Sequence, residues 1–150
     1  MADYLPSFHK FDGPGIPVPS RMYSTPDLPL AGKRFAVKDI INVLGVPTTA
    51  SSKAYEECYD TTSPTAPVIS KLLKSGAVLV GKTRTTQFAS GEGPIDWVDY
   101  HCPTNVRGDK TFSPYCSSTG SASAAAAYDW LDVAVGTDSK FEGLFSNRLN

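Results

Sequence analysis

The sequence predicts an α/β fold in which a mixed β-sheet is flanked by helices. Three short apolar runs, at residues 35–37, 77–81 and 131–136, have the length and composition of buried strands. Two further segments, residues 63–76 and 122–130, have the composition of helices. Strands that alternate with helices along a chain typically pack as a partly parallel sheet with helices against its faces.

Residues 1–27 are predicted to form an extended proline-rich leader, followed by a domain of residues 28–150. Six of the twelve prolines in this 150-residue chain fall before residue 30. Proline fixes φ and removes a backbone donor, which favours an extended path over a surface. A disordered leader is the alternative.

Regular structure is expected to begin within "KRFAVKDI", where residues 35–37 form a short apolar run suited to a buried strand. The helix that follows is "SPTAPVISKLLKSG". Pro67 suits its first turn and Gly76 suits its C-terminal end. The apolar side chains expected to share one face of this helix are Val68, Ile69, Leu72 and Leu73.

The second strand, "AVLVG", lies inside a match to the phosphate-binding signature: Gly76, four residues, Gly81, Lys82 and Thr83. In a phosphate-binding loop, the residues between the glycines leave the strand and curl their N–H groups around an anion. Here those residues are all apolar and two are β-branched, which favours an extended, buried backbone. The match is therefore interpreted as accidental, and no cofactor is predicted.

The second half of the chain continues the alternation. Residues 83–87 are predicted to start a short helix, and residues 100–123 to form a loop because of their Pro, Gly, Asn and Ser content. The loop leads into "ASAAAAYDW", an alanine-rich helix over 122–130 whose small side chains allow close packing. "LDVAVG", at 131–136, supplies the last strand.

The composition limits the kinds of binding partner that can be expected. A formal net charge of -1 gives no reason to expect nucleic acid or an anionic membrane surface as a partner. No run approaches the roughly 18 apolar residues of a membrane span. Three widely spaced cysteines without a CxxC pair suggest reduced thiols, so a cytoplasmic location is expected. No protein partner can be named.

Histidine and cysteine side chains give little support for a metal or a Ser-His site. His101, Cys102 and Cys116 supply only three soft ligands, whereas structural zinc nearly always takes four. His9 and His101 have no partner arrangement that supports a Ser-His mechanism. The sequence therefore predicts no metal site.

Four segments carry a more specific signal. They are "LAGKRFAVKDIINVLGVPTTASS", "SPTAPVISKLLKSGAVLVGKTRTTQFASGE", "SPYCSSTGSASAAAAYDWLDVAVGTDS" and "EGLFSNR". In this order they resemble the amidase signature family, and the "VDYH" and "AAYDWLD" stretches look like those of fungal amidase-like proteins. The resemblance covers residues 28–148. It implies an incomplete amidase-signature domain, the N-terminal part of a core several hundred residues long.

The resemblance also implies a site. Enzymes of this family cleave or transfer amides with a lysine, a bridging serine and a nucleophilic serine. Lys38 in "AVKD" matches the lysine, and Ser117 in "CSSTGS" matches the bridging serine, with Ser118 as the alternative if the register slips by one. Without the resemblance, Lys38 would be an ordinary charged residue at a strand end, paired with Asp39 or a neighbour, and the serines would be a linker or a helix cap.

The chemistry explains why these residue types are needed together. A serine hydroxyl must lose its proton to attack a carbonyl carbon, and an adjacent base can accept that proton. A lysine serves as the base only when it is neutral, and burial disfavours its charged form. Ser117 would relay the proton from the nucleophile to Lys38. N–H groups of a glycine-rich loop would stabilise the negative charge that develops on the substrate oxygen.

The nucleophile is the part that this sequence does not match. The family pattern continues from the "GTD" element, here residues 136–138, through glycines to the nucleophilic serine and an arginine. This chain instead runs from Ser139 into "KFEGLFSNRLN". An ungapped match puts Glu142 at the nucleophile position. A gapped match, which preserves more identities, removes the loop and places Ser146 in a structural turn.

We therefore interpret the chain as a truncated amidase-signature protein, related to serine amidohydrolases and catalytically inactive as written, a pseudoenzyme. Its retained site residues would be Lys38 and Ser117, with the nucleophile absent. One alternative is an active hydrolase of a small-molecule amide that uses a replacement serine such as Ser146. Another is a non-catalytic binding or regulatory remnant. The sequence does not identify a substrate, an oligomeric state or a pathway, nor whether the shortened chain is a genuine product.

Overall fold

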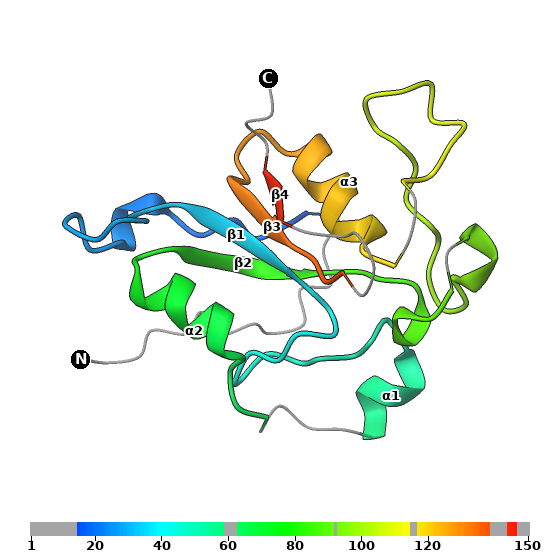
Figure 1. Cartoon of the computed structure of the whole chain (residues 1–150), viewed down its shortest axis with the longest axis horizontal. Coiled ribbons are helices and arrows are strands. Elements are labelled where there is room, and N and C mark those ends of the chain that lie inside the picture. Colours follow the sequence, from blue (N-terminus) through cyan, green and yellow to red (C-terminus); the bar gives the residue numbers. More distant parts are fainter. Residues whose placement is uncertain (1–14, 59–62, 92, 115–116, 139–143, 147–150) are drawn as a thin grey trace.

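A four-stranded sheet with the strand order β2-β1-β3-β4 forms the centre of the computed structural model (Figure 1). β1 pairs in parallel with β2 and with β3, and β4 pairs antiparallel with β3. The predicted mixed α/β fold is confirmed. The strands are β1 (Arg34–Lys38), β2 (Val78–Thr83), β3 (Val133–Val135) and β4 (Leu144–Ser146).

Helices and short turns connect these strands. The α-helices are α1 (Lys53–Cys58), α2 (Pro67–Lys74) and α3 (Thr119–Ala127). Three single 3-10 turns are η1 (Arg21–Tyr23), η2 (Gln87–Ala89) and η3 (Pro94–Asp96). The structure describes residues 15–58, 63–91, 93–114, 117–138 and 144–146.

Two apolar clusters lie on opposite faces of the sheet, because successive side chains of a strand point to opposite sides. On the α2 face, Phe35 and Val37 of β1 are buried with Ile69. On the α3 face, Ala36 is buried with Ala125. Figure 1 shows α2 and α3 on the two sides of the sheet. The small side chains of the second cluster let α3 approach the strands closely.

The three predicted strands are confirmed, and the helix at 63–76 is confirmed with its start at Pro67. Val68, however, is half exposed, while Ile69 is fully buried. The predicted short helix at 83–87 is wrong, because β2 runs through Thr83 and the 3-10 turn η2 begins only at Gln87. Residues 84–86 lie between the strand and this turn without regular structure, and their β-branched threonines favour extended rather than helical backbone.

The alanine-rich helix also differs from its prediction. α3 begins at Thr119, three residues before the expected start at 122, and ends at Ala127, three residues before the expected end at 130. Its first turn is built from Ser, Thr and Gly, which resemble loop residues in composition. Tyr128 follows with extended backbone angles and closes the helix. The earlier start places Ser118 at the N-cap.

The phosphate-loop match is accidental, as interpreted. Residues 78–83 form a regular strand hydrogen-bonded to β1 rather than a loop around an anion. Gly76 follows the end of α2 with a φ of +89°. It therefore serves the turn from helix to strand, where a left-handed backbone favours glycine.

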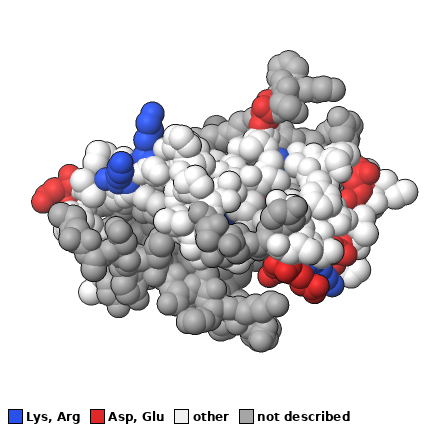
Figure 2. Space-filling model, turned by 90° about the horizontal axis from the view of Figure 1, so that it is seen from below, with Lys and Arg blue, Asp and Glu red and all other residues white. Residues whose placement is uncertain are grey.

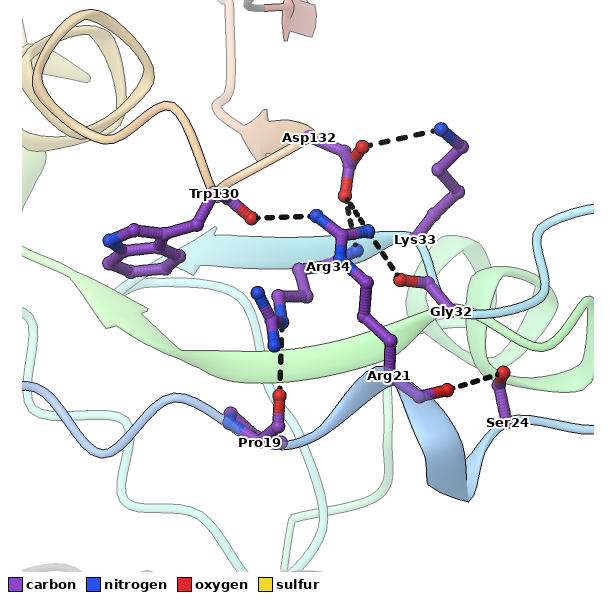
Figure 3. Close-up of polar contacts among 8 residues, drawn as sticks. All are labelled: Pro19, Arg21, Ser24, Gly32, Lys33, Arg34, Trp130 and Asp132. Atoms are coloured by element: carbon purple, nitrogen blue, oxygen red, sulfur yellow. Dashed lines mark hydrogen bonds and ion pairs between the residues drawn. The ribbon is translucent and has the colours of Figure 1, made fainter.

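Residues 15–27, the described part of the predicted leader, are joined to the sheet by polar contacts around Asp132 (Figure 3). The Arg21 guanidinium donates to an Asp132 carboxylate oxygen at 2.7 Å and also to backbone carbonyls of Gly32 and Trp130. The Arg34 N–H donates to the same carboxylate at 2.9 Å, and Lys33 donates at 3.3 Å. The boundary at residue 27 stays a prediction.

Replacing Asp132 with asparagine is expected to lower the free energy of unfolding by about 1–2 kcal/mol at pH 7, since hydrogen bonds to charged groups are worth more than neutral ones. Burial alone would raise the pKa of Asp132, but hydrogen bonds from Arg34, Arg21 and Lys33 outweigh it and lower this pKa below its ordinary value of 3.8. The stabilisation is therefore complete well above pH 3.8 and is lost as pH falls through the folded-state pKa.

Urea unfolding of the wild-type chain and Asp132→Asn at pH 7, 5 and 3 measures this effect. The difference between the two proteins should shrink toward pH 3. Asp129→Asn, at an exposed position, is the control and should behave like wild type at each pH. A wild-type advantage that stays constant down to pH 3 would contradict the proposed role of the charge.

The described surface carries both signs of charge. On the face shown in Figure 2, acidic and basic side chains are scattered around the rim, with uncharged residues between them. On this face, the described residues form no continuous basic surface of the type that tracks a phosphate backbone. None of the described helices is long and apolar enough to cross a bilayer.

Candidate active site

The amine of Lys38, at the carboxyl end of β1, is the centre of a cluster of hydroxyl groups. It donates to Ser117 Oγ at 2.7 Å, to Ser118 Oγ at 2.7 Å and to Thr137 Oγ1 at 2.8 Å. The whole Lys38 side chain is buried, with 0% of its surface exposed. The structure thus brings together the two residues that the sequence singled out, Lys38 and Ser117.

These groups meet because of the sheet topology. β1 and β3 are parallel neighbours, so their carboxyl ends lie at the same edge of the sheet. Lys38 ends β1, and Thr137 follows β3 by two residues. Side chains alternate along β1, so Lys38 points to the same face as Ala36, which is the face covered by α3. Ser117 and Ser118 lie immediately before the first turn of α3 on that face.

The two serine hydroxyls lie at the same distance from the Lys38 amine, but the serines differ in burial and in their other hydrogen bonds. Ser118 is fully buried; its hydroxyl donates to the Thr137 carbonyl at 3.2 Å and accepts from the Thr137 N–H at 3.3 Å. Ser117 is partly exposed. The Ser118 hydroxyl thus also holds the segment after β3, whereas Ser117 is the more exposed of the two serines.

A second set of hydrogen bonds holds the backbone of Ser117. The hydroxyl of Thr85, which is fully buried, donates to the Ser117 carbonyl at 2.6 Å. The Thr85 N–H in turn donates to Ser51 Oγ at 2.9 Å. The backbone of Ser117 is therefore tied to the segment that follows β2 and, through it, to the turn that follows β1.

Asp39 points to the opposite face of the sheet from Lys38. Its carboxylate accepts from the N–H groups of Thr49 and Ser51 at 3.1 Å each and from the Thr49 hydroxyl. It also forms an ion pair with Lys82 at 3.7 Å. Asp39, which directly follows β1, is thus paired with Lys82 of β2.

The contacts of Lys82 are those of a residue with a structural role. Its amine donates to the Ile41 carbonyl at 2.7 Å and to Thr48 Oγ1 at 2.8 Å. Burial lowers the pKa of Lys82, and the negative charge and hydrogen bond of Asp39 offset part of that shift. Lys82 therefore joins β2 to the turn after β1, which agrees with a structural role for the "GKT" lysine.

Residues 19–139 match the family model described as Amidase. This match covers more than half of the sequence. The chain belongs to the amidase signature family. Its fold agrees with that assignment, since about three quarters of the chain superposes on part of several solved structures.

Two curated relatives of this amidase-signature chain are glutamyl-tRNA(Gln) amidotransferase A subunits. That of Halobacterium salinarum is 43% identical over 75% of this chain and 25% of its own length. That of Saccharolobus solfataricus is 40% identical over 73% of this chain and 22% of its own length. This chain therefore spans about a quarter of the length of these relatives.

Solved structures show the same partial coverage. Kluyveromyces lactis allophanate hydrolase matches with a TM-score of 0.65 and 34% identity over 79% of this chain and 19% of that one. Native peptide amidase from Stenotrophomonas maltophilia matches with a TM-score of 0.52 and 33% identity over 73% of this chain and 22% of that one. The α/β unit described here is thus one part of a larger fold in both structures.

The sequence positions considered for a replacement nucleophile in this amidase-signature chain are only partly described. Ser139 and Glu142 lie outside the described residues. Ser146 is placed in β4, not in the turn that the gapped match implied, because its backbone pairs with β3 opposite Val133.

Two of the metal ligands weighed from sequence, His101 and Cys102, lie in the described structure. Cys102 Sγ contacts the Pro103 carbonyl at 3.6 Å. Within the described ranges, no three His, Cys, Asp or Glu side chains come close enough to hold a metal ion. Cys116 lies outside those ranges.

Two residues of the cluster were missed from sequence, Thr137 and Thr85. Thr137 had a usable signal, since it follows a predicted strand that would neighbour the strand ending at Lys38. Thr85 had none, because its contact with Ser117 joins two irregular segments 32 positions apart.

Proposed function

We propose that this chain holds the proton-accepting half of an amide-cleaving site, with Lys38 as base and Ser117 as the bridging hydroxyl, and that it does not hydrolyse amides as written. The amide substrate class comes from the amidase signature family. The relatives named as an amidotransferase subunit, an allophanate hydrolase and a peptide amidase are matched over only 19–25% of their own length.

The observation that carries the proposal is the 2.7 Å contact between Lys38 Nζ and Ser117 Oγ inside a buried cluster. A base must lie within hydrogen-bond reach of the proton that it accepts, and this distance meets that requirement. Ser117 is the partly exposed member of the pair of serines. A proton arriving at its hydroxyl from outside would therefore have a direct path to the buried amine.

Thr137 supports the same assignment. Its hydroxyl accepts from Lys38 at 2.8 Å, so the segment that leaves β3 passes directly beside the amine. In the family pattern, the nucleophile follows this "GTD" element. The place where a nucleophilic serine would enter the site is thus adjacent to Lys38, while the residues that follow in this sequence do not match the nucleophile loop.

The alternative of an active enzyme with Ser146 as nucleophile conflicts with the strand register. Ser146 pairs with Val133, which pairs with Phe35, three residues before Lys38 along β1. At about 3.3 Å per residue, this offset is roughly 10 Å along the strand direction, well beyond hydrogen-bond reach. Ser146 also lies on a strand that is separated from β1 by β3.

The purified chain is expected to release no ammonia from primary amides between pH 6 and 10 above the buffer rate, because the residues that follow the "GTD" element do not match the nucleophile loop. Stenotrophomonas maltophilia peptide amidase, assayed in parallel, is the positive control. Turnover that disappears in Lys38→Met or Ser117→Ala would contradict the inactive assignment.

A chimera tests whether the retained half is functional. Residues 1–138 are joined to the part of the peptide amidase that follows its corresponding segment, which supplies a nucleophile loop. The folded chimera should hydrolyse amides, and Lys38→Met or Ser117→Ala within it should reduce the rate by about 10²–10⁴-fold, the usual contribution of general acid–base catalysis.

Ser90→Ala, at a site whose hydroxyl donates to the Gln87 carbonyl, is the matched control and should leave the chimera's rate unchanged. A folded, active chimera whose rate does not respond to Lys38→Met would show that the lysine is not the base.

A further inference from the structure

Ser117 and Lys38 together supply both groups that a serine needs to react as a nucleophile. A reactive serine needs a base within hydrogen-bond reach that can take its proton. The 2.7 Å separation between Ser117 Oγ and Lys38 Nζ meets this requirement without a third residue. Lysine replaces histidine as the partner of the serine in some hydrolases. The pair therefore has the two groups that acylation of Ser117 itself requires.

Of the two serines beside the amine, Ser117 is the better placed to react with a small molecule. The hydrogen bond between Lys38 and Ser117 is partly buried, whereas the one between Lys38 and Ser118 is buried. Only 1% of the Ser118 surface is exposed, and its hydroxyl also contacts the Thr137 backbone at 3.2 and 3.3 Å. An acyl group on Ser118 would break those contacts and need space inside the core. Among the described residues, the Ser117 hydroxyl has Lys38 as its only hydrogen-bond partner.

The backbone around Ser117 is held next to Lys38 at two points. The Thr85 hydroxyl donates to the Ser117 carbonyl at 2.6 Å, and the Gly120 N–H donates to the Arg84 carbonyl at 3.1 Å. Arg84 and Thr85 directly follow β2, whose neighbour β1 ends at Lys38. The hydroxyl and the amine are thus positioned before any ligand binds, which lowers the entropic part of the barrier to reaction.

We propose that Ser117 reacts as a nucleophile with esters that have an acidic leaving group, such as phenyl esters, and becomes acylated. Ser117 Oγ forms a bond to the ester carbonyl carbon, and the hydroxyl proton passes to Lys38 Nζ. The bond from that carbon to the phenol oxygen breaks with its electron pair, and the phenolate leaves as an anion. The proton stays on Lys38 until solvent accepts it.

The leaving group selects this class of substrate. An amide nitrogen must be protonated before it leaves, whereas a phenolate leaves without a proton. The negative charge on the carbonyl oxygen also needs N–H donors, and the loss of one donor costs about 10²–10³-fold in rate. The residues after the "GTD" element do not match the glycine-rich loop that would supply such donors. The site should therefore accept an activated ester but not an amide, and the acyl group should then stay on Ser117.

This inference rests on the proposed role of Lys38 as base, but Ser117 is a nucleophile here and a relay in amide cleavage. The two are tested on different proteins, the complete 150-residue chain for acylation and the chimera for amide hydrolysis. If Lys38→Met stops the chimera while Ser117 of the complete chain stays unmodified, only the present inference fails. Acylation that requires Lys38, together with a chimera that does not respond to Lys38→Met, would count against the proposed function alone.

The probe is p-nitrophenyl acetate, mixed in excess with the complete chain at pH 8 while nitrophenolate release is followed by absorbance. A burst of about one equivalent per chain is expected, as for an acyl-enzyme that accumulates. Mass spectrometry of peptides should find the acetyl group on Ser117. Ser117→Ala should show no burst, and Lys38→Met should slow the burst by about 10²–10⁴-fold, the usual contribution of a general base.

Ser90→Ala, at an exposed serine, is the matched control and should be acetylated like wild type. Lys38→Arg keeps N–H donors near the hydroxyls but cannot be deprotonated, so it should also lose the burst. The inference is overturned if acetyl groups are found only on lysine amines, if Ser117→Ala keeps the burst, or if folded Lys38→Met and Lys38→Arg react at the wild-type rate. If neither lysine variant unfolds cooperatively, Ser117→Ala and the position of the acetyl group on the wild-type chain decide the question.

Discussion

Replacing Asp39 with alanine is expected to destabilise the protein by about 3–5 kcal/mol, the cost of breaking a buried ion pair from one side. Both partners are buried, with 5% of the Asp39 side chain and 11% of the Lys82 side chain exposed. The change also removes the acceptor of the Thr49 and Ser51 N–H groups. Those bonds hold a turn in which Ala50 and Ser51 have φ values of 49° and 55°.

The loss should depend on pH in a definite direction. Burial already lowers the pKa of Lys82, and without Asp39 nothing in that pair would offset the shift. The unfolded chain then binds more protons than the folded chain between the folded-state pKa and the ordinary value of 10.5. Stability rises with pH wherever the unfolded state binds more protons, so Asp39→Ala should recover part of its loss between pH 7 and 10.

Guanidinium unfolding at pH 7 and pH 10 measures both effects. Asp27→Ala, at an exposed position, is the control and should change stability by less than about 0.5 kcal/mol. In the double variant Asp39→Ala/Lys82→Met, the loss should be smaller than the sum of the losses in Asp39→Ala and Lys82→Met, since neither charge is left alone. Additive losses would show that the two side chains are not energetically coupled.

The elements that sequence patterns predicted are those whose own composition determines them. The strand at 35–37 and the strand at 77–81 are apolar runs of the right length, and Pro67 and Gly76 mark the two ends of one helix. Lys38 was located because it ends such a strand and matches the "AVKD" motif. The strand end is fixed by local sequence, whereas a site role for Lys38 was predicted only through the resemblance.

The parts that could not be predicted depend on contacts between distant segments. α1 has no fully buried residue; it is held by the Lys53 N–H donating to Asp99 and by the ring contact between Tyr55 and Phe88. α3 starts early because its first turn packs against the segment after β2, and no amphipathic pattern marks that start. The ties from Thr85 to Ser117 likewise have no local signature.

Lys38 and Asp39 show how little adjacency in sequence says about a site. Because side chains alternate along the strand, Lys38 points to the hydroxyl cluster beside α3. Asp39 points to the other face, where it contacts Lys82 and the turn that contains Thr49 and Ser51. From sequence, a neighbouring carboxylate would be expected to stabilise the charged lysine. In the structure, the Asp39 carboxylate binds Lys82 and the N–H groups of Thr49 and Ser51.

Replacing Gly120 with alanine is expected to destabilise the protein by about 3 kcal/mol, at the upper end of what overpacking a core position costs. A Cβ at this position would lie 2.8 Å from the Arg84 nitrogen and closer still to the Arg84 carbonyl oxygen, which accepts the Gly120 N–H. Both are backbone atoms and cannot rotate away. The usual gain of about 1 kcal/mol for alanine over glycine in a helix is too small to offset this clash.

Gly81→Ala separates this packing effect from the general effect of adding a methyl group. Gly81 has open space around its built Cβ, so its substitution should change the melting temperature little, while Gly120→Ala should lower it by several degrees.

The clash at Gly120 would also push the start of α3 away from β2 and so lengthen the contact of Ser117 with Lys38. In the chimera with a nucleophile loop, Gly120→Ala should therefore lose activity at temperatures where it is still folded. Equal melting temperatures for the two glycine variants would show that α3 can shift without cost, and that the hydroxyl cluster is not held in place by this backbone contact.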